Sequence, residues 1–474
     1  MKSTCIFLAV CFMLASLEPM ESTYEPSPCW EGFVDGEVYA IGMPVGNVLP
    51  VLSNGIFGLD IKTGEVIWDS FGKAWGFYCS DFEIDAGILF TGPGAYAVDA
   101  ATGEVLWKDE GMYLSGYHAL GYGKLYAAGS TFCIDLDPDY LQRSSLAAFD
   151  EFTGDLLWTF DALSEINSDI EVGRGLVLFS NLQGTVFALD HKTGEVTWST
   201  ETGEGDRKQP KPVVAEDRVL LASNALYCVD VKTGQEIWTI EKTGERWAQP
   251  VVYGDRVIVS SDVLYCIDLI SGSVVWKKER ENPLVSNNRV YVSTESGIEC
   301  LTLDGETLWT FELPGIDFGK AAADESTIVF PTVTGIVVAL DVLTGGEEWR
   351  YEVSDEITCP LLLLDDFLVI GTYSGRVIGM GAPEYEKRTD CETFLYSSKR
   401  LLLKSRNIEA LEILKESKRV CSEEDVLETD ALIEYARENY ERSKRMKTYL
   451  IIFGMAAISV CGLLISKKLK GKFF

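Results

Sequence analysis

FALDHKTGEVTW (187–198) is one copy of a pattern that recurs along much of the 474-residue chain. Six other full copies are FGLDIKTGEVIW (57–68), YAVDAATGEVLW (96–107), AAFDEFTGDLLW (147–158), YCVDVKTGQEIW (227–238), YCIDLISGSVVW (265–276) and VALDVLTGGEEW (338–349), and ECLTLDGETLW (299–309) is a shorter version. Most of the tryptophans that end these copies lie 38 to 40 residues apart. Such a period indicates a fold built from repeats.

Each part of a copy has a physical interpretation. The apolar run 186–189 suits a strand that is covered on both faces. Asp190 can accept hydrogen bonds from the backbone that follows it, as in an Asx turn, and Gly194 allows the backbone conformation that such a turn requires. Trp198 then lies on a second strand. Two more strand-like runs separate successive copies, and four short strands per repeat are typical of a propeller blade.

A small residue lies ten positions before each tryptophan, or nine in the shorter copy, so a large side chain can pack over it. These small residues are Gly58, Ala97, Ala148, Ala188, Cys228, Cys266, Cys300 and Ala339. We predict that the tryptophans pack between blades and that the motif residues are structural. The tryptophans are Trp68, Trp107, Trp158, Trp198, Trp238, Trp276, Trp309 and Trp349. The aspartates are Asp60, Asp99, Asp150, Asp190, Asp230, Asp268 and Asp341, and the glycines are Gly64, Gly103, Gly154, Gly194, Gly234, Gly272 and Gly345.

This Ala-x-Asp-x-x-x-Gly-x-x-x-Trp pattern resembles the tryptophan-docking motif of the PQQ-like (quinoprotein-type) β-propeller repeat family. The matches cover about residues 37–380. The resemblance implies an all-β, eight-bladed propeller. The family includes quinoprotein alcohol dehydrogenases and non-catalytic scaffolds, among them an outer-membrane assembly lipoprotein of Gram-negative bacteria.

The number of blades depends on how the ring closes. Strand-like runs at 360–364, 367–372 and 376–380 form a last blade that lacks its final strand and tryptophan. The N-terminal segment, with runs at 37–41 and 48–52, could donate that strand, which would protect two otherwise open edges. The same runs could instead complete a ninth blade. We expect eight blades within a propeller domain at 30–382 and leave nine open.

The two ends of the chain read as membrane signals. Lys2 and an apolar run at 5–17 indicate a secretory signal peptide at 1–22, with an uncleaved N-terminal anchor as the alternative. Residues 448–466 carry no charge and have basic residues on both sides. As a helix they would span about 28 Å, so we predict a transmembrane helix rather than a buried soluble one. The propeller would then be extracytoplasmic, and 467–474 a basic cytoplasmic tail.

Between the propeller and this span, residues 384–447 are rich in Leu, Glu, Lys and Arg. Helical spacing and turn signals predict helices at about 391–404, 408–419 and 423–447, the last one capped by Ser422. We interpret this segment as a helical stalk that is either a docking spacer or only a neck.

The charge is strongly uneven. The chain has 41 basic and 73 acidic residues, a net charge of −32. Residues 384–474 hold 18 basic and 15 acidic residues, so the first 383 hold 23 and 58, a balance of −35. Such an acidic body repels phosphate backbones, which argues against a nucleic-acid partner. The chain has only two histidines, which disfavours histidine-rich metal sites.

Cysteines and acidic clusters supply two weaker site hypotheses. If the first two stalk helices pair antiparallel, Cys391 and Cys421 lie at the same end and could form a disulfide in an oxidising compartment. Asp135, Asp137 and Asp139 alternate in the longest repeat and could hold Ca²⁺, although the EF-hand glycine and glutamate are missing and a solvated rim is the alternative.

Catalytic signatures are missing from the sequence. The family's enzymes hold a quinone and Ca²⁺ near the propeller axis and usually carry two adjacent cysteines, whereas this sequence has no Cys-Cys pair and no haem-attachment motif. We therefore expect no catalytic residue, no cofactor and no enzymatic activity, with PQQ and calcium as the alternative.

The expected function is a membrane-anchored, non-catalytic scaffold for other envelope or membrane proteins. One alternative is a PQQ- and Ca²⁺-dependent quinoprotein dehydrogenase. The other is a cell-envelope carbohydrate-binding module, because Trp30, Trp75 and Trp247 lie outside the repeat register.

Overall fold

The structure is a computed structural model. It describes residues 27–70, 82–85, 87–91, 95–109, 112–131, 145–203, 211–241, 247–279, 283–364, 367–381, 399, 402, 407–417 and 429–441.

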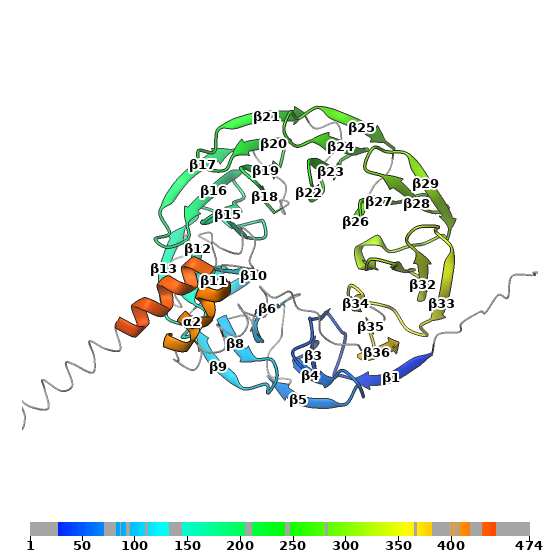
Figure 1. Ribbon diagram of the computed structural model, residues 1–474, viewed down its shortest axis with the longest axis horizontal. Helices are drawn as coiled ribbons and strands as arrows, with labels where there is room; N and C mark the ends of the chain where they lie inside the picture. The colour runs from blue at the N-terminus through cyan, green and yellow to red at the C-terminus, as the bar shows by residue number, and fades with distance from the viewer. Residues whose placement is uncertain are drawn as a thin grey trace, which may run out of the picture.

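The described strands form nine four-stranded antiparallel sheets, which are the blades of a closed ring (Figure 1). We number the blades in chain order. Blade 1 comprises β2 (Ala40–Ile41), β3 (Val48–Leu52), β4 (Ile56–Asp60) and β5 (Val66–Ser70); blade 2 comprises β6 (Glu83–Asp85), β7 (Ile88–Thr91), β8 (Ala95–Asp99) and β9 (Val105–Asp109); blade 3 comprises β10 (Met112–Gly121), β11 (Lys124–Thr131), β12 (Ser145–Asp150) and β13 (Leu156–Asp161). Blade 4 comprises β14 (Glu171–Gly173), β15 (Leu176–Ser180), β16 (Thr185–Asp190) and β17 (Val196–Glu201); blade 5 comprises β18 (Val213–Ala215), β19 (Arg218–Ala222), β20 (Ala225–Asp230) and β21 (Glu236–Glu241); blade 6 comprises β22 (Val251–Tyr253), β23 (Arg256–Ser260), β24 (Leu264–Asp268) and β25 (Val274–Lys278). Blade 7 comprises β26 (Leu284–Ser286), β27 (Arg289–Ser293), β28 (Gly297–Thr302) and β29 (Thr307–Glu312). The 3₁₀ turn η2 (Phe318–Lys320) leads into blade 8, which comprises β30 (Ala322–Ala323), β31 (Thr327–Pro331), β32 (Ile336–Asp341) and β33 (Glu347–Glu352). Blade 9 comprises β34 (Leu362–Leu364), β35 (Phe367–Gly371), β36 (Arg376–Gly381) and β1 (Pro28–Phe33).

The expectation of eight blades was wrong, and nine, the number left open, is what the structure has. The runs at 37–41 and 48–52 supply β2 and β3 of blade 1, and β1 supplies the missing strand of blade 9. Trp30 on β1 lies opposite Gly379 on β36, the same pairing of an indole with a small residue that the other blades show. Because this repeat is divided between the two ends of the propeller, no contiguous copy of the pattern reveals it.

The motif tryptophans join each blade to the next. Trp198 lies opposite Ala188 within blade 4, and its indole Nε1 donates a hydrogen bond to the carbonyl of Val231 in blade 5 at 2.8 Å. A Cβ atom on Gly234 of blade 5 would lie 2.7 Å from the same indole. The glycine is therefore required by the close approach of the neighbouring blade's indole as well as by its turn.

The motif aspartates hold the turn that receives the indole. The carboxylate of Asp190 accepts hydrogen bonds from the backbone N–H groups of Lys192 and Thr193, both at 2.9 Å. Gly194 has a φ of 71°, in the left-handed region that a side chain disfavours. The same few residues therefore form both the turn and the surface on which the neighbouring blade's indole packs.

The cysteines at the small-residue positions, Cys228, Cys266 and Cys300, are buried free thiols, as their position in the repeat predicts. Burial raises the pKa of Cys228 to about 12, so this thiol is protonated and unreactive at neutral pH.

Within the described part of the chain, no helix is both long and apolar enough to cross a membrane. The predicted signal peptide (1–22), transmembrane helix (448–466) and basic tail (467–474) lie outside the described residues. So do the proposed calcium ligands Asp135, Asp137 and Asp139 and both cysteines of the proposed disulfide, Cys391 and Cys421.

Candidate functional site

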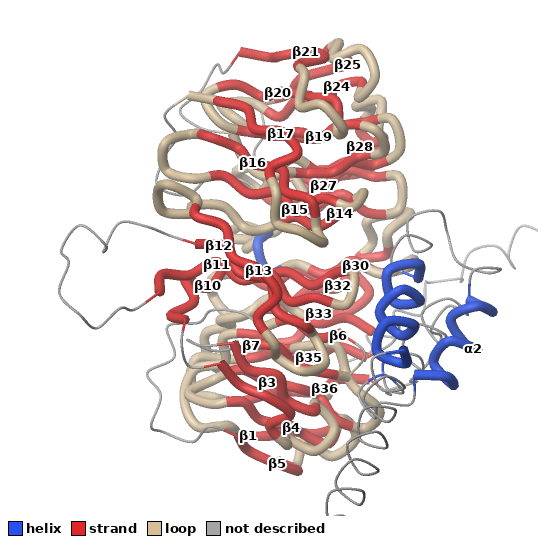
Figure 2. The backbone as a smooth tube through the Cα atoms, turned by 90° about the vertical axis from the view of Figure 1, so that its left-hand side faces the viewer, coloured by secondary structure: helices blue, strands red, loops and turns tan. Residues whose placement is uncertain are grey.

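The helices of the C-terminal segment lie together on one face of the disk (Figure 2). This face is formed by the turns that join the first strand of each blade to the second and the third to the fourth, and we call it the turn face. The helices are α2 (Asn407–Ser417) and residues 429–441, with residues 399 and 402 also helical. The segment that the sequence presents as a stalk therefore contacts the propeller.

Apolar side chains of both helices join the core of blades 2 and 3. Leu432 lies over the turn of blade 3, where a Cβ on Gly123 would lie 3.5 Å from its Cδ2 atom. Phe152 of blade 3 packs against Tyr435, with ring centroids 5.2 Å apart. The buried helical residues in this cluster are Leu402, Ala410, Leu414, Leu432, Ile433 and Ala436. Their burial provides the main stabilisation of the docked segment.

Polar contacts fix the position of helix 429–441. The Tyr435 hydroxyl donates a hydrogen bond to the Asp150 carboxylate of blade 3 at 3.1 Å. Burial, followed by the neighbouring Asp150 charge, raises the pKa of Tyr435 above its usual value, so the hydroxyl keeps the proton that it donates. Glu434, one residue before, forms an ion pair with Lys192 of blade 4. The helix thus contacts two neighbouring blades.

A buried lysine anchors the beginning of the helical segment. Lys399 is only 3% exposed and forms an ion pair with Asp85 of blade 2. Its Nζ atom also lies 4.0 Å from a carboxylate oxygen of Glu151, which is fully buried in blade 3. Buried charges are retained in proteins where they are paired in this way.

The propeller deviates from its own repeat where the helices dock. The residue after the motif aspartate is buried and apolar in most blades, namely Ile61, Ala100, Val231, Leu269 and Val342. In blades 3 and 4 it is Glu151 and His191. The following residue, Phe152, is buried in blade 3, whereas its counterparts Lys62 and Lys232 are exposed. These departures from the repeat are the sequence signal that could have located the docking site.

We expect Tyr435→Phe to weaken helix docking by about 0.5–1.5 kcal/mol, because the hydrogen bond to Asp150 is lost while the ring still packs on Phe152. Backbone amides in 429–441 should exchange with solvent faster, measured by hydrogen exchange and mass spectrometry. Tyr440→Phe is the matched control, since Tyr440 is an exposed tyrosine of the same helix. Equal effects of the two substitutions would contradict the assigned contact.

His191 lies beneath the docked helix, between blades 3 and 4. Its ring packs against Tyr122 with centroids 4.3 Å apart, and the Tyr122 hydroxyl accepts a hydrogen bond from Gly175 N–H at 2.8 Å. Burial, together with the nearby Lys124 charge, lowers the pKa of His191 to about 4. The imidazole is therefore neutral at physiological pH.

This lowered pKa makes stability depend on pH in a defined window. An unfolded chain binds a proton at histidine near pH 6.5, whereas the folded chain resists it down to about pH 4. His191 therefore costs stability progressively as the pH falls from about 6.5 to about 4. We expect the His191→Leu variant to lose less stability than the wild type as the pH falls through that window. The measurement is the difference between the denaturation midpoints of variant and wild type at each pH. A constant difference across the window would contradict the assignment.

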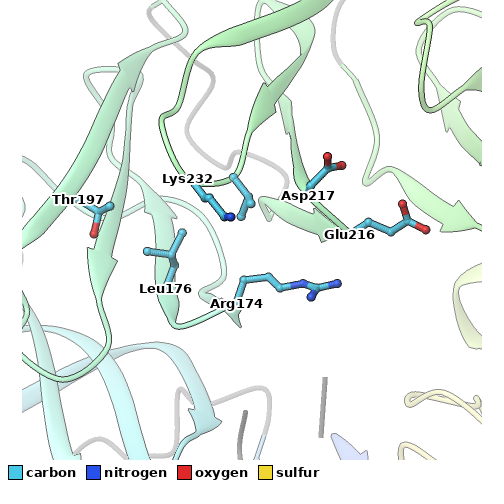
Figure 3. Close-up of a pocket in the computed structure, with 7 residues that line it drawn as sticks. Arg174, Leu176, Thr197, Glu216, Asp217 and Lys232 are labelled. Carbon is cyan, nitrogen blue, oxygen red and sulfur yellow. The ribbon is translucent and has the colours of Figure 1, made fainter. Parts of the chain in front are cut away.

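A groove of 670 Å³ opens on the turn face between blades 4 and 5 (Figure 3). Its lining residues are Arg174, Leu176, Thr197, Glu216, Asp217, Val231 and Lys232. Arg174 and Glu216 both have a φ of 54° and occupy equivalent turns of the two blades. The groove combines a buried apolar floor, Leu176 and Val231, with charged walls.

Two of the three aromatics that suggested a carbohydrate site, Trp30 and Trp247, are buried. Trp30 is 7% exposed because it is the docking indole of blade 9, with Nε1 donating to the Ile61 carbonyl at 2.7 Å. Trp247 is 1% exposed and packs against Tyr265. Neither presents a ring face to solvent for stacking on a sugar. Trp75 lies outside the described residues.

No group of three or more His, Cys, Asp or Glu side chains is placed to hold a metal ion in the part of the chain that the structure describes.

Nine antiparallel sheets joined by docked tryptophans define a β-propeller of the PQQ-like repeat type. The profile of the family described as outer membrane protein assembly factor BamB matches residues 93–246 and 222–408, more than half of the chain. The chain belongs to this family.

Solved structures with a similar fold come from proteins of different kinds. BamB from Moraxella catarrhalis has 16% identity and a TM-score of 0.47, covering 75% of this chain and 100% of that one. The computationally designed Ika8 protein has 14% identity and a TM-score of 0.50, covering 75% and 99%. Quinohemoprotein alcohol dehydrogenase from Comamonas testosteroni has 12% identity and a TM-score of 0.49, covering 77% and 78%. At these identities the likeness concerns the fold alone.

One curated relative matches locally. Subunit 1 of methanol dehydrogenase [cytochrome c] from Methylorubrum extorquens is 34% identical over 80 residues. The match covers 15% of this chain and 13% of that protein, so the chain spans only a small part of the relative's length.

Proposed function

We propose that the chain is a membrane-anchored, extracytoplasmic and non-catalytic scaffold that holds other envelope or membrane proteins. The observation that carries the proposal is the docked helix on the turn face. Tyr435, Glu434 and Lys399 contact side chains that project from turns of three successive blades. A rigid ring that displays many turns is suited to recognising protein segments, and here one such segment is already bound.

The charge of the propeller supports protein rather than nucleic-acid partners. Its balance of −35, counted over the first 383 residues, opposes association with phosphate backbones. Family membership supports the same role, since the family is described by a protein of outer membrane assembly.

The proposed anchor is the helix at 448–466, with the C-terminus cytoplasmic. The docked helix reaches residue 441, and Thr448 follows seven residues later. Seven residues extend at most about 25 Å, so the docked helix would keep the turn face close to the bilayer. Partners embedded in or attached to the same membrane would then meet this face first.

Photo-crosslinking from intact membranes tests the proposal. A photoreactive amino acid at Ile270 probes the turn face, and one at Val333 probes the opposite face; both side chains are exposed, at 52% and 75%. We expect defined protein adducts from Ile270 and few from Val333. Adducts from neither position in intact membranes would contradict the scaffold, and adducts only from Val333 would reverse the assignment of the face.

The anchor has a separate test. The full chain should stay with membranes through an alkaline carbonate wash, whereas a chain that ends at residue 447 should be released. Retention of the shortened chain would contradict the proposed span.

A quinoprotein dehydrogenase is the second candidate, favoured by the local match to methanol dehydrogenase. Bound PQQ would supply the oxidising group, but among the residues that the structure describes none can be assigned to hold it or its calcium ion. Adding PQQ and Ca²⁺ to the purified chain and following bound chromophore and alcohol-dependent dye reduction decides between the two functions. Alcohol-dependent dye reduction would show that the chain is an enzyme and would contradict the non-catalytic scaffold.

A further inference from the structure

The repeat places equivalent residues around two neighbouring grooves of the turn face. One groove lies between blades 3 and 4 and the other between blades 4 and 5. In the strand pairing, Lys124, Leu176 and Arg218 each lie opposite the motif aspartate of their blade. This shared register fixes the alignment of the three blades. Tyr122, Arg174 and Glu216, two residues earlier, share a left-handed φ of 54° to 56°. Side chains in the two grooves can therefore be compared position by position.

The groove between blades 3 and 4 is filled and covered. Tyr122 and His191 pack together within it, and both are buried. Helix 429–441 crosses above, with Glu434 bound to Lys192 and Tyr435 bound to Asp150. The turn face thus holds this helix by two kinds of contact. Apolar side chains of the helix pack on the core of blades 2 and 3, and Glu434 pairs with the lysine two residues after the motif aspartate of blade 4.

The groove between blades 4 and 5 keeps the lysine but lacks the filling side chains. Lys232 stands where Lys192 stands, two residues after its motif aspartate. Arg174 replaces Tyr122 and Val231 replaces His191, so no pair of rings fills the space, and 670 Å³ is open (Figure 3). Leu176 and Val231 form an apolar floor beneath this space.

The charge in this groove differs from that of the body. Asp217 is paired with Arg218. Arg174 and Lys232 form no salt bridge with the described residues, and Glu216 is the remaining acid among the lining residues. The four charged lining residues, Arg174, Lys232, Glu216 and Asp217, therefore sum to zero, on a propeller whose overall balance is −35. A carboxylate that enters the groove therefore meets less negative charge than the propeller carries on average, and it can pair with Lys232 or Arg174.

We propose that the groove between blades 4 and 5 binds an acidic amphipathic helix of a partner protein, with a glutamate of that helix paired to Lys232 as Glu434 is paired to Lys192. Apolar residues of the same helix face would pack on Leu176 and Val231. This inference rests on the proposed scaffold function and names the class of segment that the scaffold recognises.

The test uses a fluorescent peptide with the sequence of residues 427–443, LETDALIEYARENYERS, which includes the helix that the neighbouring groove already binds. Fluorescence anisotropy measures its binding to the purified full chain. We expect saturable binding that Lys232→Glu weakens about fivefold to tenfold, as expected for loss and reversal of one exposed ion pair. A peptide carrying Glu434→Lys should bind Lys232→Glu better than it binds the wild type.

Lys62→Glu is the matched control, because Lys62 is the exposed lysine at the same motif position of blade 1. It should leave the affinity within about twofold. Equal weakening by both substitutions would show general charge attraction and overturn the proposal, as would no saturation below about 1 mM peptide. If Lys192→Glu abolishes binding while Lys232→Glu does not, the peptide exchanges with the chain's own helix, and the proposal also falls. None of these outcomes affects the photo-crosslinking test of the scaffold itself.

Discussion

Trp30→Ala should lower the free energy of unfolding by about 3–5 kcal/mol, the cost typical of removing a large buried aromatic side chain. Trp30 packs across the closure against Gly379 and Phe367 of blade 9, and against Gly64 of the neighbouring blade 1. Its loss removes contacts on both sides of the point where the two ends of the propeller meet. Chemical denaturation followed by circular dichroism measures the change without depending on tryptophan fluorescence.

Phe33→Ala provides the control for this substitution. Phe33 lies on the same strand, β1, but is 63% exposed, so its removal should change stability by at most about 0.5 kcal/mol. If Trp30→Ala is as mild as Phe33→Ala, then β1 does not close the ring through its indole.

Gly345→Ala should cost about 2–4 kcal/mol, because two separate penalties apply. The residue has a φ of 70°, which a side chain disfavours. A Cβ atom there would also lie 2.4 Å from the indole of Trp309, closer than any real contact. Since the indole is held by a hydrogen bond from its Nε1 to the Val342 carbonyl at 3.1 Å, it cannot move away without losing that bond.

Gly254→Ala separates the two penalties. Gly254 also has a positive φ, 57°, but nothing lies within 4 Å of the position of its Cβ. Only the backbone penalty of about 1–2 kcal/mol applies there. The same denaturation measurement should show Gly345→Ala to be clearly the more harmful. Equal losses would mean that overlap with the indole contributes nothing.

The contiguous repeats could be predicted from the sequence because the residues that form each turn and the following strand lie close together along the chain. Asp190, Gly194 and Trp198 stand within a single stretch, so turn and strand follow from neighbouring residues. The ninth blade could not be counted in this way, because Trp30 and Gly379 belong to opposite ends of the propeller and meet only through strand pairing. Trp30 therefore lies outside the repeat register in the sequence, although in the structure it is the inter-blade tryptophan of blade 9.

The docking of the C-terminal helices escaped prediction for a related reason. Helical spacing indicates that 408–419 and 423–447 form helices, and α2 and residues 429–441 fall within or close to these ranges. Periodicity does not say what an apolar helix face contacts. The informative residues are on the propeller: Glu151, Phe152 and His191 differ from their counterparts in the other repeats. Reading a repeat for its exceptions therefore gives information about partners that its consensus does not contain.

The pairing of β1 with β36 also constrains how the protein is made. The thiol of Cys29 donates a hydrogen bond to the carbonyl of Gly379, across a separation of 350 residues. A ribosome adds about 5–20 residues per second, so the strand that emerges first waits tens of seconds for its partner. During synthesis the growing chain exposes an unpaired β36-binding edge on β1, while the intermediate blades can form in order. Ring closure must then wait until β36 has been made, and contacts of such long range are the slow ones in folding.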